Sequence, residues 1–202
     1  MTESPNTDKP SIEKPSIEKL PDDDFRRVLC VAAHPDDMEY GAGAAVARWT
    51  AQGKKVVYCM VTSGEAGIDG LHPDECGPIR EAEQLAACRA VGVETCDFLR
   101  LPDGILEYGV PLRRALAEVV GRHQPDVVLT INFHETFGGQ NLNQADHIAV
   151  GRAVLDAVRD AGNRWLFPEQ LTDGLAPWGG VRAVWAGNSP RAGHGVDTSD
   201  SF

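Results

Sequence analysis

The amino-acid sequence predicts a single α/β domain with a doubly wound, mostly parallel sheet and helices on both faces. Two observations support this class. Short apolar runs alternate along the chain with longer segments of helical character, which is typical of strand–helix–strand units. The apolar runs are also nearly continuous, as expected for strands that are buried on both faces of a parallel sheet.

The first strand–helix–strand unit follows a charged N-terminal segment. Residues 27–33 (RVLCVAA) form a continuous apolar run and predict a strand. A segment rich in small residues at 39–52, ended by Gly53, predicts the first helix. The run KVVYCMVT at 55–62 predicts the second strand.

Three further helix–strand pairs follow with the same cadence. Pro78 is expected to open the next helix, because proline is favoured at the first helical position. The predicted helices are 78–91, 110–123 and 146–161. The predicted strands are 97–101, 126–132 and 181–187. In such a sheet, ligands bind at the carboxyl ends of the strands, so a site is expected in the loops that follow them.

The first 24 residues differ from the rest of the chain. They contain the tandem repeat KPSIE-KPSIE at 9–18 and the acidic run at 22–24, with little apolar surface to bury. We therefore expect 1–24 to be a disordered acidic tail and 25–202 to be the folded domain.

The charge balance excludes several classes of partner. Nineteen Lys and Arg residues against thirty Asp and Glu residues give a net charge of −11, which argues against binding to nucleic acid or to an anionic membrane surface. No apolar run approaches the roughly 20 residues that span a bilayer, and no signal peptide is evident. Five cysteines without a CxxC pair are expected to be reduced and structural. The sequence predicts a cytoplasmic protein and leaves its oligomeric state open.

The densest polar group, HPDDME at 34–39, directly follows the first predicted strand. His34 and Asp37 are three residues apart and can converge on one metal ion, while Asp36 faces a neighbouring water. A single aspartate at this position would more often be a helix cap. Four polar residues in one turn at a sheet edge favour a site.

A further ligand comes from NQADH at 143–147, after the fourth predicted strand. His147 lies in the first turn of its predicted helix, at the same edge of the sheet. Together with His34 and Asp37 it supplies two imidazoles and one carboxylate, which suits a catalytic zinc site with an open position. The same ligands could hold Fe²⁺ or another divalent ion.

The sequence resembles the PIG-L/LmbE-like zinc-dependent deacetylases, which remove an N-acetyl group from glucosamine-containing substrates. The resemblance runs from residue 27 to residue 202. It rests on these segments, in order: AHPDDME (33–39), VTSGEAG (61–67), IREAEQLAACRAVGV (79–93), LPDG (101–104), NQADHIAVGRA (143–153) and GHGVDTSDSF (193–202).

The resemblance implies a role for each matching residue. The metal ligands would be His34, Asp37 and His147. Asp36 would be the general base that deprotonates a zinc-bound water, and the resulting hydroxide would attack the acetamide. His194 would act as oxyanion stabiliser or general acid. Arg80 would bind substrate. The alternative is that Arg80 is an ordinary exposed residue of its helix, with a solvated guanidinium.

One position departs from the family pattern. A histidine that is common three residues before the metal ligand is replaced by Gln144, which cannot share a proton. Asp146 could orient a neighbouring group or simply favour the helix N-terminus. Glu39 and His134 are further pocket candidates, with an exposed loop position as the alternative for His134.

Two segments imitate functional motifs. The string His72-Pro73-Asp74 repeats the HPD sequence but follows no strand closely, so we expect a mobile rim or lid. Gly41 and Gly43 suggest a dinucleotide fingerprint, but the third glycine is absent and close helix packing is expected instead.

The sequence therefore predicts a zinc-dependent hydrolase acting on a small molecule, an N-acetylglucosamine-type conjugate. One alternative is an amidase with the same machinery that acts on a thiol conjugate or a natural-product amide. A more remote one is a non-catalytic nucleotide-binding α/β module. Family members usually continue beyond the last motif, so the resemblance implies one of two things: the C-terminal end is truncated, or the C-terminal closure of the site is unusual.

Overall fold

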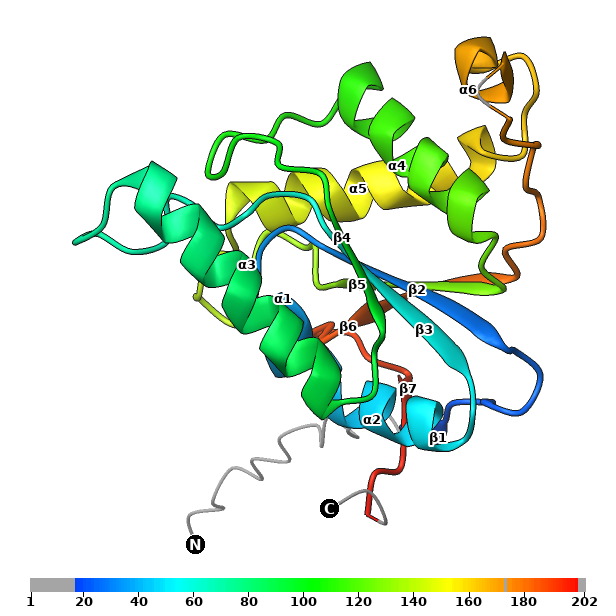
Figure 1. The fold of residues 1–202 in the computed structure, drawn as a ribbon. Coiled ribbons are helices and arrows are strands. Elements are labelled where there is room, and N and C mark those ends of the chain that lie inside the picture. Colours follow the sequence, from blue (N-terminus) through cyan, green and yellow to red (C-terminus); the bar gives the residue numbers. More distant parts are fainter. Residues whose placement is uncertain (1–16, 173, 200–202) are drawn as a thin grey trace, which may run out of the picture.

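The computed structural model describes residues 17–172 and 174–199, and its centre is a five-stranded parallel sheet (Figure 1). The strand order is β4-β3-β2-β5-β6, with every neighbouring pair parallel. The strands are β2 (Arg27–Ala32), β3 (Lys55–Met60), β4 (Thr95–Phe98), β5 (Val127–Ile131) and β6 (Ala183–Gly187). The order reverses beside β2, as it does in a doubly wound sheet, and the predicted fold class is confirmed.

Helices cover both faces of this sheet (Figure 1). They are α1 (Asp37–Gly41), α2 (Gly43–Ala51), α3 (Pro73–Ala90), α4 (Val110–His123), α5 (Ala145–Asp160) and the short α6 (Pro168–Thr172). Side chains of α4 and α5 pack with Leu29 and Val31 of β2, whereas side chains of α1, α2 and α3 pack with Val28 and Cys30. Successive residues of β2 thus enter two different cores, which is why the strand is apolar throughout. Among the described helices, none has the length and apolar character needed to cross a membrane.

Helix α3 begins five residues earlier than the sequence suggests. His72 is its N-cap, with Nδ1 accepting a hydrogen bond from the backbone N–H of Asp74 at 3.3 Å, and Pro73 occupies the first turn. The segment predicted as a mobile rim is therefore the start of a helix, and Pro78 lies inside it. Either proline could open a helix on local grounds. The buried Cys76, which donates to the Gly64 carbonyl oxygen at 3.5 Å, anchors the earlier turn.

The helix predicted at 39–52 is divided at Ala42, whose backbone φ of −156° separates α1 from α2. At this point α1 approaches the sheet closely. A Cβ on Gly41 would lie 3.2 Å from Ile131 Cγ2, and one on Gly187 would lie 3.0 Å from the Gly41 carbonyl oxygen. Close packing, not a dinucleotide fingerprint, is therefore the role of Gly41.

Part of the predicted tail is folded against the domain. Strand β1 (Glu18–Lys19) pairs in parallel with β7 (His194–Gly195). Asp22 is buried and lies 3.4 Å from the Arg48 guanidinium. The expectation of disorder is thus wrong for residues 17–24, because strand pairing and an ion pair compensate for their lack of apolar surface. The rest of the predicted tail lies outside the described residues.

Gly151 of α5 provides a stability test of this packing. A Cβ there would lie 2.3 Å from Phe133 Cβ, so Gly151→Ala must displace Phe133 or the helix. Despite the better helix propensity of alanine, we expect the free energy of unfolding to fall by about 1–3 kcal/mol. Urea denaturation measures it. The matched variant Gly121→Ala in α4, where a Cβ would be 3.6 Å from Leu175 Cδ1, should be neutral or stabilising; equal effects in both variants would contradict the argument.

Candidate metal centre and active site

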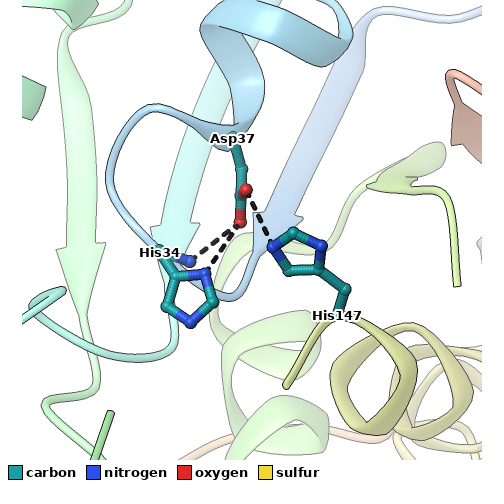
Figure 2. A group of neighbouring side chains, drawn as sticks. All are labelled: His34, Asp37 and His147. Carbon is teal, nitrogen blue, oxygen red and sulfur yellow. Dashed lines mark hydrogen bonds and ion pairs between the residues drawn. The ribbon is translucent and has the colours of Figure 1, made fainter. Parts of the chain in front are cut away.

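The first two site residues are brought together by the turn between β2 and α1 (Figure 2). His34 follows the end of β2, and Asp37 begins α1. Asp36 between them has a positive φ of 87°, a conformation that Asp tolerates better than most residues. The turn places the His34 backbone N–H 2.9 Å and the His34 Nδ1 3.6 Å from Asp37 Oδ2.

The third residue, His147, comes from the first turn of α5. Its Nε2 lies 3.1 Å from Asp37 Oδ1, so the Asp37 carboxylate lies between the two imidazoles (Figure 2). On the other side of the ring, Nδ1 lies 2.9 Å from Asn143 Oδ1. The amide group of Asn143 is itself fixed, because its Nδ2 donates to the carbonyl oxygens of Asn132 and His134. Nδ1 of His147 therefore donates to Asn143, and Nε2 is left to face Asp37.

Two more carboxylates lie at the outer nitrogen of His34. His34 Nε2 is 3.0 Å from Asp103 Oδ1 and 3.3 Å from Asp146 Oδ2. Asp146 is completely buried and accepts the backbone N–H groups of Gly104 and Leu106. The structure thus gives Asp146 a contact with a site residue, in addition to its place at the start of α5.

Asp103 was not singled out from the sequence. Its side chain is 5% exposed and accepts the backbone N–H of Ala66 at 2.9 Å. The sequence feature that could have indicated Asp103 is the LPDG segment. This segment follows the third predicted strand, at the same sheet edge as the other polar loops.

These contacts shift the pKa values of the two central residues. Burial lowers the pKa of His34, but the hydrogen bond and charge of Asp37, with the nearby Asp103 and Asp146, raise it to about 9. Burial raises the pKa of Asp37, whereas hydrogen bonds with His147 and His34 hold it well below its ordinary value. Three carboxylates, those of Asp37, Asp103 and Asp146, thus lie around the His34 ring, and such a surrounding favours a positive charge at this position, whether a proton on His34 or a bound cation.

The donor set fits a divalent metal ion. His34, Asp37 and His147 each offer one ligand atom, and these atoms lie within 4.8 Å of one another. The other nitrogen of each imidazole is held by carboxylates or by Asn143, as is usual for metal-binding histidines. A second group, His34 with Asp103 and Asp146, is equally compact. Because Asp146 already accepts two backbone N–H groups, this second group is better suited to orient His34.

Asp36, which lies between His34 and Asp37 in the turn, is held by two residues of α3. Arg80 Nη2 lies 2.6 Å from Asp36 Oδ2 and 2.9 Å from the Pro35 carbonyl oxygen. The Asp36 backbone N–H donates to Gln84 Oε1 at 2.9 Å, and Gln84 Nε2 donates to Glu39 Oε1 at 2.8 Å. Gln84 is only 1% exposed. A buried glutamine with these partners fixes the turn, and the sequence offered no signal for it beyond its place in the third matching segment.

The metal ligands lie between two cavities. One, of about 350 Å³, is called the polar cavity here; it is lined by His34, Pro35, Asp36, Asp37, Gly64, Ala66, Gly67, Arg80, Asp103, Gly104, Gln144 and His147. The other, of about 260 Å³, is called the apolar cavity; it is lined by Asp37, Tyr40, Ile131, Asn132, Phe137, His147 and Asn188. Asp37 and His147 belong to both, so a molecule bound at the metal ligands can reach either cavity.

The remaining predicted site residues lie at different distances from the metal ligands, and only some of them line the two cavities. Gln144 lines the polar cavity as the N-cap of α5. Glu39 holds Gln84 and lines a third cavity of about 840 Å³. His134 is half-buried, stacks on Phe133 and, within the described residues, is outside the lining of both cavities beside Asp37.

His194 does not join the metal ligands. It lies on β7, where its Nε2 is 4.0 Å from Glu18 Oε2, and its side chain is 54% exposed. It lines the 840 Å³ cavity. This segment pairs with β1, and the oxyanion or acid role that the resemblance implies for His194 stays a prediction.

Comparisons with known proteins show which family this chain resembles in sequence. The family model described as GlcNAc-PI de-N-acetylase (PIG-L) matches residues 29–158. A diacetylchitobiose deacetylase of Thermococcus kodakarensis is 29% identical over 182 residues, which cover 89% of this chain and 66% of that protein. A 1D-myo-inositol 2-acetamido-2-deoxy-alpha-D-glucopyranoside deacetylase of Kineococcus radiotolerans is 33% identical over 187 residues, covering 76% of this chain and 49% of that protein.

A solved structure shows the same fold. The N,N'-diacetylchitobiose deacetylase of Pyrococcus horikoshii, complexed with its inhibitor MPG, superposes with a TM-score of 0.80 at 25% identity, covering 88% of this chain and 66% of that one. The chain therefore spans about half to two thirds of the length of these relatives. The family match includes the β2–α1 turn, Arg80, Gln84, Asp103 and the start of α5. With this match over most of the sheet and over all three metal-binding candidates, the chain belongs to the PIG-L family of de-N-acetylases.

Proposed function

We propose that this protein is a metal-dependent deacetylase that removes the N-acetyl group from an N-acetylglucosamine-type conjugate. The observation that carries the proposal is the grouping of His34, Asp37 and His147 beside the carboxylate of Asp36, at the edge of the polar cavity. Hydrolysis of an amide requires polarisation of its carbonyl, an activated water and a proton for the departing amine, and this grouping can supply all three.

His34, Asp37 and His147 would hold the metal, with Zn²⁺ as the expected ion and Fe²⁺ as the alternative. When bound, such an ion acts as a Lewis acid on the amide carbonyl and lowers the pKa of water. The chain's own contribution is to orient these ligands: Asn143 fixes the ring of His147, and Asp103 and Asp146 fix the ring of His34.

Asp36 is the residue placed to move protons. In the proposed reaction it accepts a proton from the attacking water and then passes it to the amine nitrogen as the C–N bond breaks. Arg80 holds its carboxylate through the 2.6 Å contact, and Gln84 holds its backbone. These two contacts restrict the carboxylate to the side of the turn that faces the polar cavity.

The polar cavity suits the amino-sugar part of the substrate. Arg80 and Gln144 offer donors to hydroxyl groups, and a volume of about 350 Å³ is within the range of small-molecule sites. The relatives are named as deacetylases of diacetylchitobiose and of 1D-myo-inositol 2-acetamido-2-deoxy-alpha-D-glucopyranoside, which supports the same substrate class here. The cytoplasmic location inferred from the sequence stays a prediction.

The test combines two measurements on the full-length protein. Metal content is determined after purification without chelators, and acetate release is followed with N-acetylglucosamine, N,N'-diacetylchitobiose and an acetylglucosaminyl-inositol conjugate. We expect one bound divalent ion and acetate release from at least one of these sugars. Release only from a non-sugar amide, such as an N-acetyl thiol conjugate, would contradict the substrate class, and absence of a bound metal together with absence of acetate release would contradict the mechanism.

A further inference from the structure

The two cavities beside the metal ligands differ in chemistry. The polar cavity is lined by charged and amide side chains, among them Asp36, Arg80 and Gln144. Apart from Asp37 and His147, the apolar cavity is lined by Tyr40, Ile131 and Phe137 and by two uncharged asparagines. Such a division suits a substrate whose two ends differ in polarity.

We infer that the apolar cavity receives the acyl group of the substrate, and that the enzyme accepts N-acyl chains several carbons longer than acetyl. This inference rests on the proposed function, because it assumes that an amide is cleaved at the metal ligands.

The position of Asp36 decides which end of the amide enters which cavity. The departing nitrogen must receive a proton, and Asp36 lines the polar cavity but not the apolar one. The amine side of the amide therefore lies in the polar cavity. Asp37 and His147 are shared by both cavities, so the acyl side of the same carbonyl carbon is directed to the other one.

The apolar cavity is larger than an acetyl group requires. A methyl group is similar in size to a water molecule, whose share of liquid volume is about 30 Å³, whereas this cavity measures about 260 Å³. Tyr40, Phe137 and Asn188 also line the neighbouring cavity of about 840 Å³. The two cavities thus adjoin at these three residues, and in the proposed arrangement a longer chain would extend from the apolar cavity toward the larger one.

The aromatic side chains of this cavity are exposed, and hydrogen bonds hold their backbones. Phe137 is 49% exposed, and its ring lies edge-on to that of His147 with centroids 6.0 Å apart. Its backbone N–H donates to the Asn141 carbonyl oxygen at 2.9 Å, within a turn closed by a bridge between Thr136 and Leu142.

Tyr40 lines the same cavity; it is 83% exposed, and its backbone carbonyl oxygen accepts a hydrogen bond from Asn188 Nδ2 at 2.9 Å. An acyl chain between Tyr40 and Phe137 would cover apolar surface that water now contacts, which is favourable.

The experiment compares N-acetyl-, N-butyryl- and N-hexanoyl-glucosamine as substrates of the full-length metal-loaded protein. We expect kcat/KM for the hexanoyl compound to lie within about tenfold of that for the acetyl compound. Phe137→Ala should lower the hexanoyl-to-acetyl ratio of kcat/KM by about tenfold, which corresponds to about 1.4 kcal/mol for the lost apolar contact. Leu142→Ala is the matched control: Leu142 lies in the same turn and is 80% exposed, but it lines neither cavity beside Asp37. It should leave the ratio unchanged.

A binding measurement separates this inference from the proposed function. Calorimetric titration of the wild-type protein with hexanoate and with acetate should show tighter binding of hexanoate, and Phe137→Ala should remove that preference. If acetyl compounds are hydrolysed but hexanoyl compounds react more than a hundredfold more slowly, the acyl assignment is wrong and the proposed function stands.

A Phe137→Ala variant that changes the preference among sugar aglycones but not among acyl chains would likewise overturn the assignment. If no N-acyl sugar is hydrolysed at all, the proposed function fails. The hexanoate titration then tests the acyl assignment of the apolar cavity independently of catalysis. A preference for hexanoate that depends on Phe137 supports the assignment, and equal binding of hexanoate and acetate refutes it.

Discussion

Asp36→Asn is expected to lower the rate of deacetylation by two or more orders of magnitude while the bound metal remains nearly unchanged. Asp36 does not belong to the compact group formed by His34, Asp37 and His147, so the metal ligands are untouched. An asparagine cannot accept the proton of the attacking water, and loss of general acid–base help typically costs about 10²–10⁴-fold. The loss should appear in kcat measured by acetate release, with metal content measured on the same sample.

Asparagine is the right replacement at this position for a structural reason. The backbone φ of Asp36 is 87°, and asparagine adopts this left-handed conformation more readily than alanine does. The amide oxygen can still accept a hydrogen bond from Arg80, so the turn should persist. Asp74→Asn is the matched control, because Asp74 belongs to the second HPD string but its side chain is 91% exposed on α3. A rate for Asp36→Asn equal to the wild-type rate, or an equal loss in both variants, would remove Asp36 from the mechanism.

The sequence predicted the sheet well because its signals are local. Continuous apolar runs such as 27–33 mark strands that are buried on both faces, and the structure places that run at the centre of the sheet as β2. The start of α3 was missed because both Pro73 and Pro78 satisfy the local rule for a first helical turn. Which of them is used depends on the burial of Cys76 against the loop after β3, a tertiary contact that no local pattern contains.

The site residues likewise divide into those that a local sequence pattern predicts and those that only the folded chain brings together. His34 and Asp37 lie close together in the chain, so their convergence follows from one turn, and His147 was found by its place at the same sheet edge. Asp103 and Gln84 were missed as site residues, because their roles depend on the distance between loops and helices in the folded chain. Asp103 meets His34 across 69 positions of sequence, and Gln84 meets Asp36 across 48.

His34→Ala is expected to abolish stable metal binding, and with it deacetylation. The variant removes one of three ligands and leaves Asp37, Asp103 and Asp146 without the imidazole that now lies among them. Asp146→Asn should have a smaller effect, since loss of a residue that orients a ligand typically weakens metal affinity by about 10–100-fold. Metal content after dialysis, and competition with a chelator of known affinity, would establish this order.

His72→Ala is the control that makes the metal result specific. His72 belongs to the second HPD string, but its side chain is 70% exposed and it caps α3 rather than facing a carboxylate cluster. We expect a small loss of stability from the missing cap, on the order of 1 kcal/mol, with full metal content. Circular dichroism of every variant distinguishes loss of metal from loss of fold, and His34→Gln repeats the test with a polar side chain if the alanine variant does not fold. Full metal retention in a folded His34 variant would show that the ion is held elsewhere, and the assignment of His34, Asp37 and His147 would then be wrong.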